Sequence, residues 1–143
     1  IALSGSIANG RSVLAAQALG ADLAYMGTRF IATKEANAPA AYKKALIEAA
    51  GGGDIIYSNL FTGVPGNYLR SSGAAAGLDP DNLPQSDKSA MNFGSGGNTK
   101  QKAGRDIWGA GQGVGQSGES PTGQELVDRL AAEYSEAKQA LAA

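Results

Sequence analysis

The sequence predicts an α/β fold in which helices cover parallel strands. Ala2 and Leu3 end a short apolar run, and the segment "ADLAYM" (residues 21–26) is apolar on both faces. A strand that is apolar on both faces suits a parallel sheet covered by helices. An alanine-rich, helix-favouring segment lies between the two. The order strand, loop, helix, strand in so compact a span predicts a βαβ unit.

The elements of this unit follow one another closely. A loop rich in Gly, Ser and Asn, "SGSIANG", comes after the first strand. The segment "RSVLAAQAL" favours a helix, and Gly20 stands where a helix-ending glycine is expected. The second strand stops at Gly27 and is followed by "TRFI", a candidate short helix over residues 28–31.

Further helices are predicted downstream. A helix over residues 40–50 places its apolar side chains on one face, and these are Tyr42, Ala45, Leu46 and Ala49. A final helix is amphipathic and should pack on a larger body, with apolar positions Leu126, Val127, Leu130, Tyr134, Ala137 and Leu141. Thr122 and Glu125 form a plausible capping box at its start, while Ser120 before Pro121 is a rival N-cap.

The middle of the chain carries a weaker pattern. "IIYS" (residues 55–58) is a strand candidate, and a short helix is expected around Tyr68 to Ser72. Residues 77–104 are rich in Gly, Asn, Pro, Asp and Ser and are expected to form an excursion on the surface of the fold. The carboxylates of this excursion, Asp79, Asp81 and Asp87, are expected to be solvated.

Composition excludes several classes of function. The 143 residues suit one domain, and a net charge of −1 without a basic stripe argues against nucleic-acid binding. The chain has no cysteine and no histidine, so thiolate chemistry and the commonest general base are missing. No apolar run approaches the roughly 20 residues that span a bilayer. We expect a cytoplasmic protein without a metal site. Because the chain begins at Ile1 in the middle of an apparent strand, we also expect it to be the C-terminal piece of a longer chain.

Two loops that follow strands are candidates for binding a phosphate. Gly5 and Ser6 follow the first strand, and Gly27 and Thr28 follow the second. In a parallel α/β fold both loops lie at the carboxyl ends of strands, where their backbone N–H groups can meet an anion. If Thr28 begins a short helix, its N-terminus adds a partial positive charge. Ordinary βα turns would look the same, and spacing alone leaves both interpretations open.

Other candidates are left open by the residues alone. Arg29 suits direct phosphate binding, or an outward position in which it pairs with a carboxylate. The glycine-dense "WGAGQGVGQ" suits a flexible turn, or a loop laid against a planar ligand with Gln112 forming a hydrogen bond. Trp108 favours a packing role over stacking on a ligand. Tyr25, Tyr42, Tyr57 and Tyr68 are candidates for the core or for a lid.

The segment "SGSIANGRSVLAAQALGADLAYMGTRFIAT" resembles the end of the barrel in FMN-dependent nitronate monooxygenases, formerly called 2-nitropropane dioxygenases. The family pattern there is a Gly-Gly-Ile-Ala-(Asp/Asn)-Gly-Arg loop, a helix, and a strand ending Met-Gly-Thr-Arg-Phe. "YKKALIEA", "FTGVPGNYLR", "KSAMNFGSGGNTK" and "RDIWGAGQGVG" resemble the same family in the same order. Ser6 stands where many members have glycine, and Gly73, Gly104 and "QSGESPTG" also depart from the pattern.

The resemblance implies a (β/α)8 TIM barrel that binds FMN. It places the phosphate on Gly5, Ser6, Gly27 and Thr28, and it places Gln112 and Gly113 near the flavin. This chain would be the C-terminal segment of a single FMN-binding domain, with barrel strands and phosphate loops in 1–33, an excursion in 34–104, and the glycine-rich loop and last helix in 105–143. The family's catalytic base is a histidine, so the base is expected in the missing N-terminal part, and the segment alone is expected to be inactive.

Three functions remain open at this stage. The first is oxidation of alkyl nitronates with O₂, the flavin accepting the electrons. The second keeps the FMN barrel but makes it an enoyl-acyl-carrier-protein reductase, and the third is a non-enzymatic half-barrel that binds a phosphate ligand. The partners expected for the first are the nitronate, O₂ and the missing N-terminal part of the barrel, with no nucleic acid and no membrane. A homodimer is one assembly that it allows.

Overall fold

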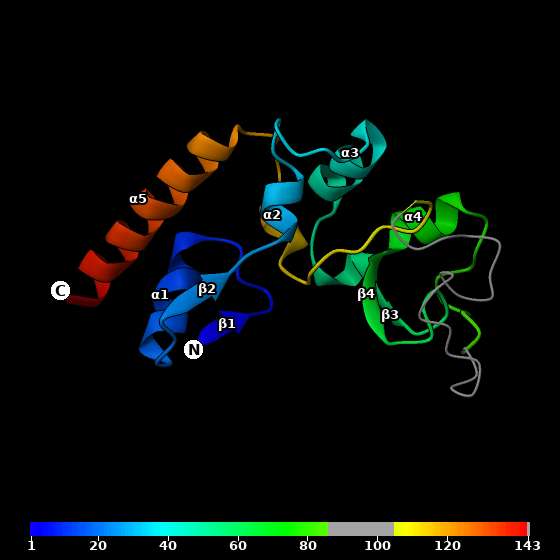
Figure 1. Ribbon diagram of the computed structural model, residues 1–143, viewed down its shortest axis with the longest axis horizontal. Coiled ribbons are helices and arrows are strands. Elements are labelled where there is room, and N and C mark those ends of the chain that lie inside the picture. Colours follow the sequence, from blue (N-terminus) through cyan, green and yellow to red (C-terminus); the bar gives the residue numbers. More distant parts are fainter. Residues whose placement is uncertain (86–104, 143) are drawn as a thin grey trace. The chain divides into compact units, whose positions relative to one another are not determined.

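The computed structural model describes residues 1–85 and 105–142 and divides the chain into two compact units. The first unit consists of Ile1–Gly51 and Gln112–Ala143, and the second of Gly52–Gly111. Figure 1 shows the elements of each unit along the chain. In the described ranges, no helix combines the length and the apolar character needed to cross a bilayer.

The first unit is built on the expected βαβ motif. Strand β1 (Ala2–Ser4) pairs in parallel with β2 (Leu23–Tyr25), and helix α1 (Gly10–Ala18) connects them. In register, Ala2 lies opposite Leu23 and Ser4 lies opposite Tyr25. The α/β fold and the parallel strands predicted from the sequence are therefore confirmed.

Side chains and backbone groups at both ends of α1 fix its length. Asn9 caps the N-terminus: its side chain accepts the Ser12 N–H at 2.8 Å, and the Ser12 hydroxyl accepts the Asn9 N–H at 3.1 Å. At the other end the Gly20 N–H donates to the Gln17 carbonyl at 2.9 Å, as expected for a helix-ending glycine. Backbone groups at both ends of α1 thus find hydrogen-bond partners within a few residues.

Three helices complete the first unit together with a short 3₁₀ turn, η3 (Val114–Gln116). They are α2 (Thr28–Ile31), α3 (Ala40–Glu48) and α5 (Gly123–Ala142). Leu46 of α3 is fully buried, as its place on the predicted apolar face requires. Helix α5 packs along α1 and buries Leu126 and Ala137.

The start of α5 settles the choice between its two possible caps. The Thr122 N–H donates to Oε2 of Glu125 at 2.7 Å, and the Glu125 N–H donates back to the Thr122 hydroxyl at 3.1 Å. The predicted capping box is therefore confirmed. Val127 and Leu141 were expected on the packed face but are 49% and 79% exposed, because contacts with α1 bury only part of the apolar stripe.

The described part of the second unit contains an antiparallel pair of strands and one helix. After the 3₁₀ turn η1 (Gly52–Asp54), strand β3 (Ile55–Ser58) pairs with β4 (Gly66–Leu69), and α4 (Arg70–Ala75) follows directly. The helix expected around Tyr68 was placed too early. Tyr68 lies in β4 opposite Ile56, since pairing with β3 and burial outweigh local helix preference.

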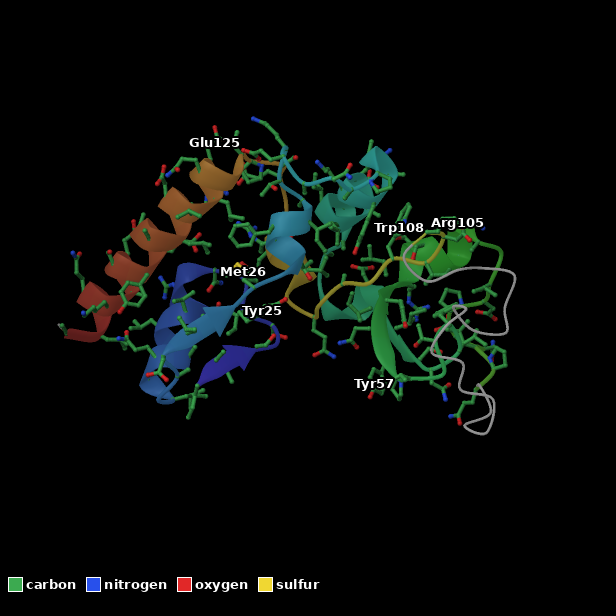
Figure 2. The ribbon with its side chains drawn as sticks, viewed as in Figure 1. Tyr25, Met26, Tyr57, Arg105, Trp108 and Glu125 are labelled. Carbon is green, nitrogen blue, oxygen red and sulfur yellow. The ribbon has the colours of Figure 1, made fainter. Side chains whose placement is uncertain are left out.

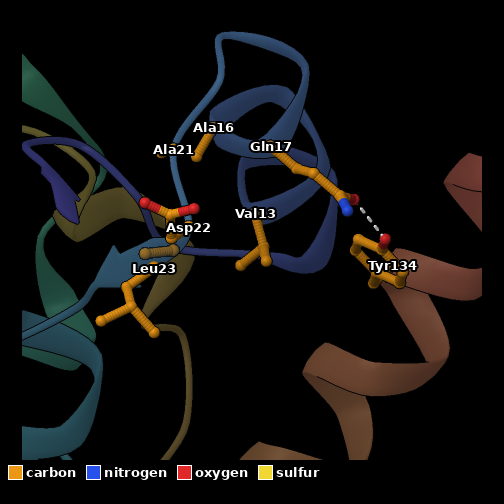
Figure 3. Close-up of a pocket in the computed structure, with 8 residues that line it drawn as sticks. Val13, Ala16, Gln17, Ala21, Asp22, Leu23 and Tyr134 are labelled. Atoms are coloured by element: carbon orange, nitrogen blue, oxygen red, sulfur yellow. Dashed lines mark hydrogen bonds between the residues drawn. The ribbon is translucent and has the colours of Figure 1, made fainter. Parts of the chain in front are cut away.

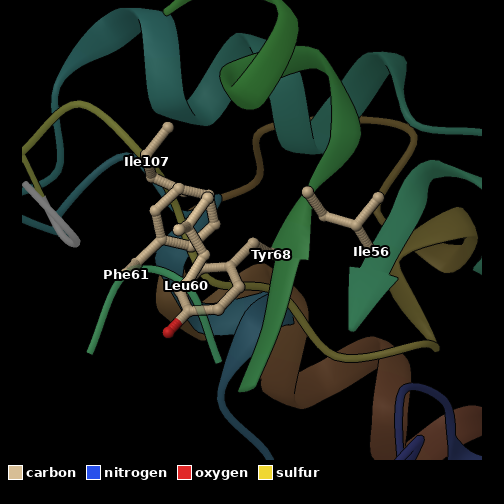
Figure 4. Packing of buried hydrophobic residues seen from close by; sticks show 5 residues of the cluster. All are labelled: Ile56, Leu60, Phe61, Tyr68 and Ile107. Atoms are coloured by element: carbon tan, nitrogen blue, oxygen red, sulfur yellow. The ribbon is translucent and has the colours of Figure 1, made fainter. Parts of the chain in front are cut away.

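The second unit closes its own hydrophobic core (Figure 4). Phe61 and Ile107 are fully shielded from solvent, and the Phe61 ring meets the Tyr68 ring edge-on at 4.8 Å between centroids. Ile56 and Leu60 complete the cluster, which joins β3, β4 and the segment after residue 104.

Candidate functional site

The two predicted loops leave the same edge of the β1–β2 sheet. Gly5 directly follows β1, and Gly27 follows β2 after Met26. Because the strands are parallel and Ser4 pairs with Tyr25, the two loops start about one strand spacing apart, ~4.8 Å. Figure 2 labels Tyr25 and Met26 at this end of β2. The structure therefore brings together the two segments that the sequence singled out.

The first loop turns sharply through left-handed backbone conformations. Gly5 has φ +103° and Ser6 has φ +55°. A residue with a Cβ atom costs about 1 kcal/mol or more in this region, whereas glycine adopts it freely. This explains why glycine is common at the position of Ser6 in the family that the chain resembles. Both residues are exposed, so their backbone groups are open to a ligand.

The second loop opens a short helix. The carbonyl of Gly27 accepts the Phe30 N–H at 2.9 Å and the Ile31 N–H at 3.2 Å, so Gly27 is the N-cap of α2. Thr28 is therefore the first residue of α2, and its backbone N–H lies at this end of the helix. A Cβ atom added to Gly27 or to Gly5 would meet nothing within 4 Å. Neither glycine is needed for packing within the described chain, and the space beside both is free of protein atoms.

The glycine-rich loop, from the far end of the chain, packs against the loop of Gly5 and Ser6. A Cβ atom on Gly113 would lie 3.0 Å from Cβ of Ala8 and 3.1 Å from the Ser6 carbonyl oxygen. The Asn9 side-chain amide also donates to Oε1 of Gln116 at 3.5 Å. Gly113 is thus packed directly against the loop of Gly5 and Ser6, and its neighbour Gln112 is exposed. All six predicted residues lie in the first unit.

The C-terminal end of α2 is held firmly in place. The Lys43 ammonium donates to the Thr33 carbonyl at 2.7 Å and to the Lys34 carbonyl at 3.0 Å. The Ser120 hydroxyl donates to the Ala32 carbonyl at 2.7 Å. The carbonyls that follow the last residue of α2 therefore receive a cation and a hydroxyl.

Arg29 does not take the outward position that was one of the two alternatives for it. The side chain is only 6% exposed, and its Nε has no hydrogen-bond partner among the described residues. Burial lowers the pKa of the guanidinium, Arg129 lowers it further, and Glu133 opposes them. Phe30, the next residue of the same helix, is 38% exposed. The helix is turned so that the cation, and not the ring, faces the interior.

One pocket of the first unit lies away from these loops (Figure 3). It encloses about 450 Å³ between α1, α5 and the beginning of β2, where Ala21, Asp22 and Leu23 line it. The Tyr134 hydroxyl donates to Oε1 of Gln17 beside it. Because the pocket lies at the opposite end of β2 from Gly27, it is not the predicted phosphate site.

The candidates in the second unit have structural partners. The Trp108 indole N–H donates to the Arg105 carbonyl at 3.2 Å, and the Trp108 backbone N–H donates to the Ser72 hydroxyl at 3.1 Å. Figure 2 shows Trp108 near Arg105, with Tyr57 on the neighbouring hairpin. These contacts agree with a packing role for the indole. Tyr68 is buried in the core, whereas Tyr57 is 74% exposed.

The acidic residues of the second unit are exposed as expected where the structure describes them. Asp79 and Asp81 are exposed, and Asp81 accepts a hydrogen bond from Nη2 of Arg70 at 2.7 Å. Asp87 and Gly104 lie outside the described residues. Gly73, a departure from the family pattern, is buried within α4 with the Ile56 side chain 3.6 Å from where its Cβ would be.

Sequence reasoning missed the residues that hold the first loop in place. The Gly10 N–H at the start of α1 donates to Oε2 of Glu133 at 2.7 Å. The Asn9…Ser12 spacing of a capping box was a readable signal for the start of α1. No local signal points to Glu133, which is 123 residues away from its partner.

Comparisons with known proteins show which family and which solved structures the chain resembles. The family profile described as Nitronate monooxygenase matches residues 1–133. A solved mutant of FabK from Thermotoga maritima is 27% identical with a TM-score of 0.71, over 98% of this chain and 43% of that one. Nitroalkane oxidase from Streptomyces ansochromogenes is 29% identical with a TM-score of 0.64, over 98% and 40%. This chain thus spans less than half the length of either structure. A comparison with curated proteins gives no significant match.

Proposed function

We propose that this chain, which belongs to the nitronate monooxygenase family, forms the phosphate-binding part of a flavin-dependent oxidoreductase. One observation carries the proposal. Three separate segments, at Gly5 and Ser6, at Gly27, and at Gly113, come to one edge of a parallel sheet with little side-chain bulk. Exposed backbone amides at the carboxyl ends of parallel strands are the usual donors to a phosphate group.

Each residue of the proposed site has a defined task. The backbone N–H groups of Gly5, Ser6 and Gly27 and the backbone and hydroxyl of Thr28 would hold the FMN phosphate. The start of α2 adds a partial positive charge there, although so short a helix adds little. Gln112 and Gly113 would form part of the wall beside the flavin, since Gly113 already lies against the Ser6 loop.

We further propose that the whole protein oxidises alkyl nitronates with O₂ and that this chain is the last part of a (β/α)8 barrel. FMN, when bound, supplies the electron-accepting chemistry. The residues of this chain bind and orient the cofactor, and the sequence contains no histidine to serve as base. The 143-residue chain alone is therefore expected to bind flavin weakly or not at all and to oxidise no nitronate.

A single substitution tests the phosphate site. Thr28→Glu places a carboxylate where the phosphate dianion would lie, so FMN retention should be abolished by charge repulsion. The measurement is the flavin content of the purified protein that carries this chain, from its visible absorbance. Ser135→Glu adds the same charge on an exposed position of α5 and should leave flavin content unchanged. Full flavin content in Thr28→Glu would contradict the assignment.

The reaction is tested separately from cofactor binding. The flavin-loaded protein should release nitrite from an alkyl nitronate in the presence of O₂. NADH consumption with an enoyl thioester, without nitrite release, would overturn the nitronate assignment while leaving the phosphate site intact.

A further inference from the structure

The sequence contains one Asn–Gly dipeptide, Asn9–Gly10, and it lies at the start of helix α1. Asparagine followed by glycine is especially prone to deamidation, because glycine has no side chain to hinder attack by its backbone nitrogen. Each residue also has a structural role. Asn9 is the N-cap of α1, and a Cβ atom on Gly10 would lie 2.3 Å from the backbone nitrogen of Tyr134 in α5. Packing against α5 therefore keeps glycine directly after the capping asparagine.

Deamidation of Asn9 begins with attack by the Gly10 nitrogen. This nitrogen loses its proton and bonds to Cγ of Asn9, the Cγ–Nδ2 bond breaks, and the side-chain nitrogen takes up a proton and leaves as ammonia. Water then opens the succinimide ring. Addition at Cγ gives aspartate, and addition at the backbone carbonyl carbon gives isoaspartate, whose main chain runs through Cβ and Cγ. Because the ring nitrogen has no hydrogen, the ring forms only when the hydrogen bond from the Gly10 N–H is lost.

The Gly10 N–H is held by a carboxylate. Gly10 is buried, and its N–H donates to Oε2 of Glu133 at 2.7 Å. A hydrogen bond to an ionised acceptor is roughly twice as strong as one between neutral groups. The carboxylate also disfavours the negative charge that develops on the nitrogen as its proton leaves, since like charges this close repel. Glu133 therefore opposes the first step of the reaction.

The backbone at Asn9 has the wrong conformation for ring closure. A succinimide ring is nearly planar, so Cβ of Asn9 must eclipse the Gly10 nitrogen about the Cα–C bond. In the structure ψ of Asn9 is 171°, an extended conformation that is far from this arrangement. Rotation about ψ would move the Gly10 N–H, and the hydrogen bond to Glu133 resists that motion. The cap adds a second restraint, because Oδ1 of Asn9 accepts the Ser12 N–H at 2.8 Å.

We infer that Asn9–Gly10 is a latent deamidation site and that Glu133 of α5 suppresses the reaction there. The carboxylate holds the attacking nitrogen in a conformation that does not close the ring, and it opposes loss of the proton. The two products differ in their effect on α1. Aspartate caps a helix about as well as asparagine, whereas isoaspartate lengthens the backbone by a carbon atom and moves its carboxylate off the cap. The inference does not depend on flavin binding, because it concerns only the contact between α1 and α5.

The test measures the rate of deamidation in the protein that carries this chain, at mildly alkaline pH. The tryptic peptide that ends at Arg11 contains Asn9, and chromatography with mass spectrometry resolves its asparagine, aspartate and isoaspartate forms. Glu133→Gln keeps an oxygen that accepts the Gly10 N–H but removes the charge, and Glu133→Ala removes both. Glu136→Gln removes a charge from an exposed position on the same helix and is the matched control.

The folded protein should deamidate at Asn9 much more slowly than the same protein unfolded in denaturant. Glu133→Gln should raise the rate in the folded protein roughly tenfold, because a charge-assisted hydrogen bond becomes a weaker neutral one. Glu133→Ala should raise the rate further, and Glu136→Gln should leave it unchanged. An unchanged rate in both Glu133 variants would overturn the inference, as would equal rates in the folded and the unfolded protein.

A separate variant distinguishes the role of Glu133 from a general loss of stability. Leu126→Val weakens the buried packing of α5 about two helical turns before Glu133 and leaves the Gly10 hydrogen bond in place. Circular dichroism in denaturant gives the stability of each variant. Under conditions of equal stability, Leu126→Val should deamidate more slowly than Glu133→Gln. Equal rates would show that overall folding, and not Glu133, protects Asn9.

Discussion

The two units of the molecule bury the covered faces of their sheets to different degrees. In the second unit, Ile56 of β3 and Tyr68 of β4 are 7% and 8% exposed, and Tyr57 on the opposite face is 74% exposed. In the first unit, Leu23 and Tyr25 of β2 are 69% and 68% exposed on the open face. Ala24, which lies between them and points to the other face, is half-buried. One face of the β1–β2 sheet is thus covered and the other is not.

The difference follows from the type of sheet. An antiparallel hairpin needs cover on one face only, and the segment from Leu60 to Phe61 with Ile107 provides it. Parallel strands occur almost only in sheets covered on both faces. The first unit has just two such strands, each with one neighbour among the described residues. This supports the proposal that further strands of the same barrel flank β1 and β2.

The largest expected effect is the loss of a buried ring in the second unit. Phe61→Ala should lower the free energy of unfolding by about 3–5 kcal/mol, because it removes the ring that packs on Tyr68 and leaves a cavity. Leu23→Ala, the matched change on the open face, should cost less than about 0.5 kcal/mol in this chain. Denaturant unfolding followed by the fluorescence of the single tryptophan, Trp108, measures Phe61→Ala in the second unit, and circular dichroism, dominated by α5, measures Leu23→Ala in the first.

The stability changes of Phe61→Ala and Leu23→Ala together decide whether the two units differ in burial. An equal loss of stability in both variants would show that the face of Leu23 is covered in solution, for example by a second copy of the chain. In the longer protein proposed above, Leu23→Ala should become costly, because the same side chain would then face other strands.

A second comparison uses two glycines of the helices, one in each unit. Gly10→Ala should destabilise the first unit by about 3 kcal/mol, since its Cβ would lie 2.3 Å from the backbone nitrogen of Tyr134. Gly73→Ala should stabilise the second unit by about 0.5–1 kcal/mol, because its Cβ would make an ordinary 3.6 Å contact with Ile56 and alanine favours the helix.

Circular dichroism and Trp108 fluorescence distinguish these two glycine effects. The 20-residue α5 dominates the helical signal, so Gly10→Ala should shift the transition seen by circular dichroism. Gly73→Ala should raise the fluorescence midpoint instead. A neutral Gly10→Ala would mean that α1 and α5 pack less closely than the structure shows.

The sequence allowed much of the first unit to be predicted because its signals are local. Gly20, the Thr122–Glu125 box and the apolar strands depend on neighbours a few residues away. The strand at Tyr68 was missed because its partner, Ile56, lies across a hairpin. Arg29 and Glu133 were beyond local reasoning, since burial and charge at those positions depend on helix α5, about 100 residues from α2.

The candidate site also combines residues that local signals predict with a contact that depends on distant parts of the chain. Gly5, Ser6, Gly27 and Thr28 could be selected from strand ends alone, and the parallel pairing of β1 and β2 brings their loops together. The approach of Gly113 to Ser6 depends on tertiary packing, and only the family resemblance suggested it. Phosphate binding by these residues stays a prediction until flavin content is measured.

The smallest expected effect is on stability at low pH, and it also differs between the two units. Hydrogen bonding from Arg70 lowers the pKa of Asp81 below 3.8, and the Thr122 N–H lowers that of Glu125 below 4.5. A carboxyl whose folded pKa is lowered stabilises the fold above its ordinary pKa, and this stability is lost as pH falls through the folded value.

Replacing either carboxylate by its neutral amide should therefore weaken the pH dependence of stability, and each change affects the unfolding transition of a different unit. Asp81→Asn should reduce the acid sensitivity of the fluorescence transition below about pH 3.8, and Glu125→Gln that of the circular dichroism transition below about pH 4.5. Both carboxylates are exposed, so solvent screens them and each change should be slight. Above pH 5 neither variant should alter the pH dependence, because both carboxyls are then ionised whether the chain is folded or unfolded. If Asp81→Asn alters only the circular dichroism transition, the ion pair with Arg70 does not stabilise the second unit.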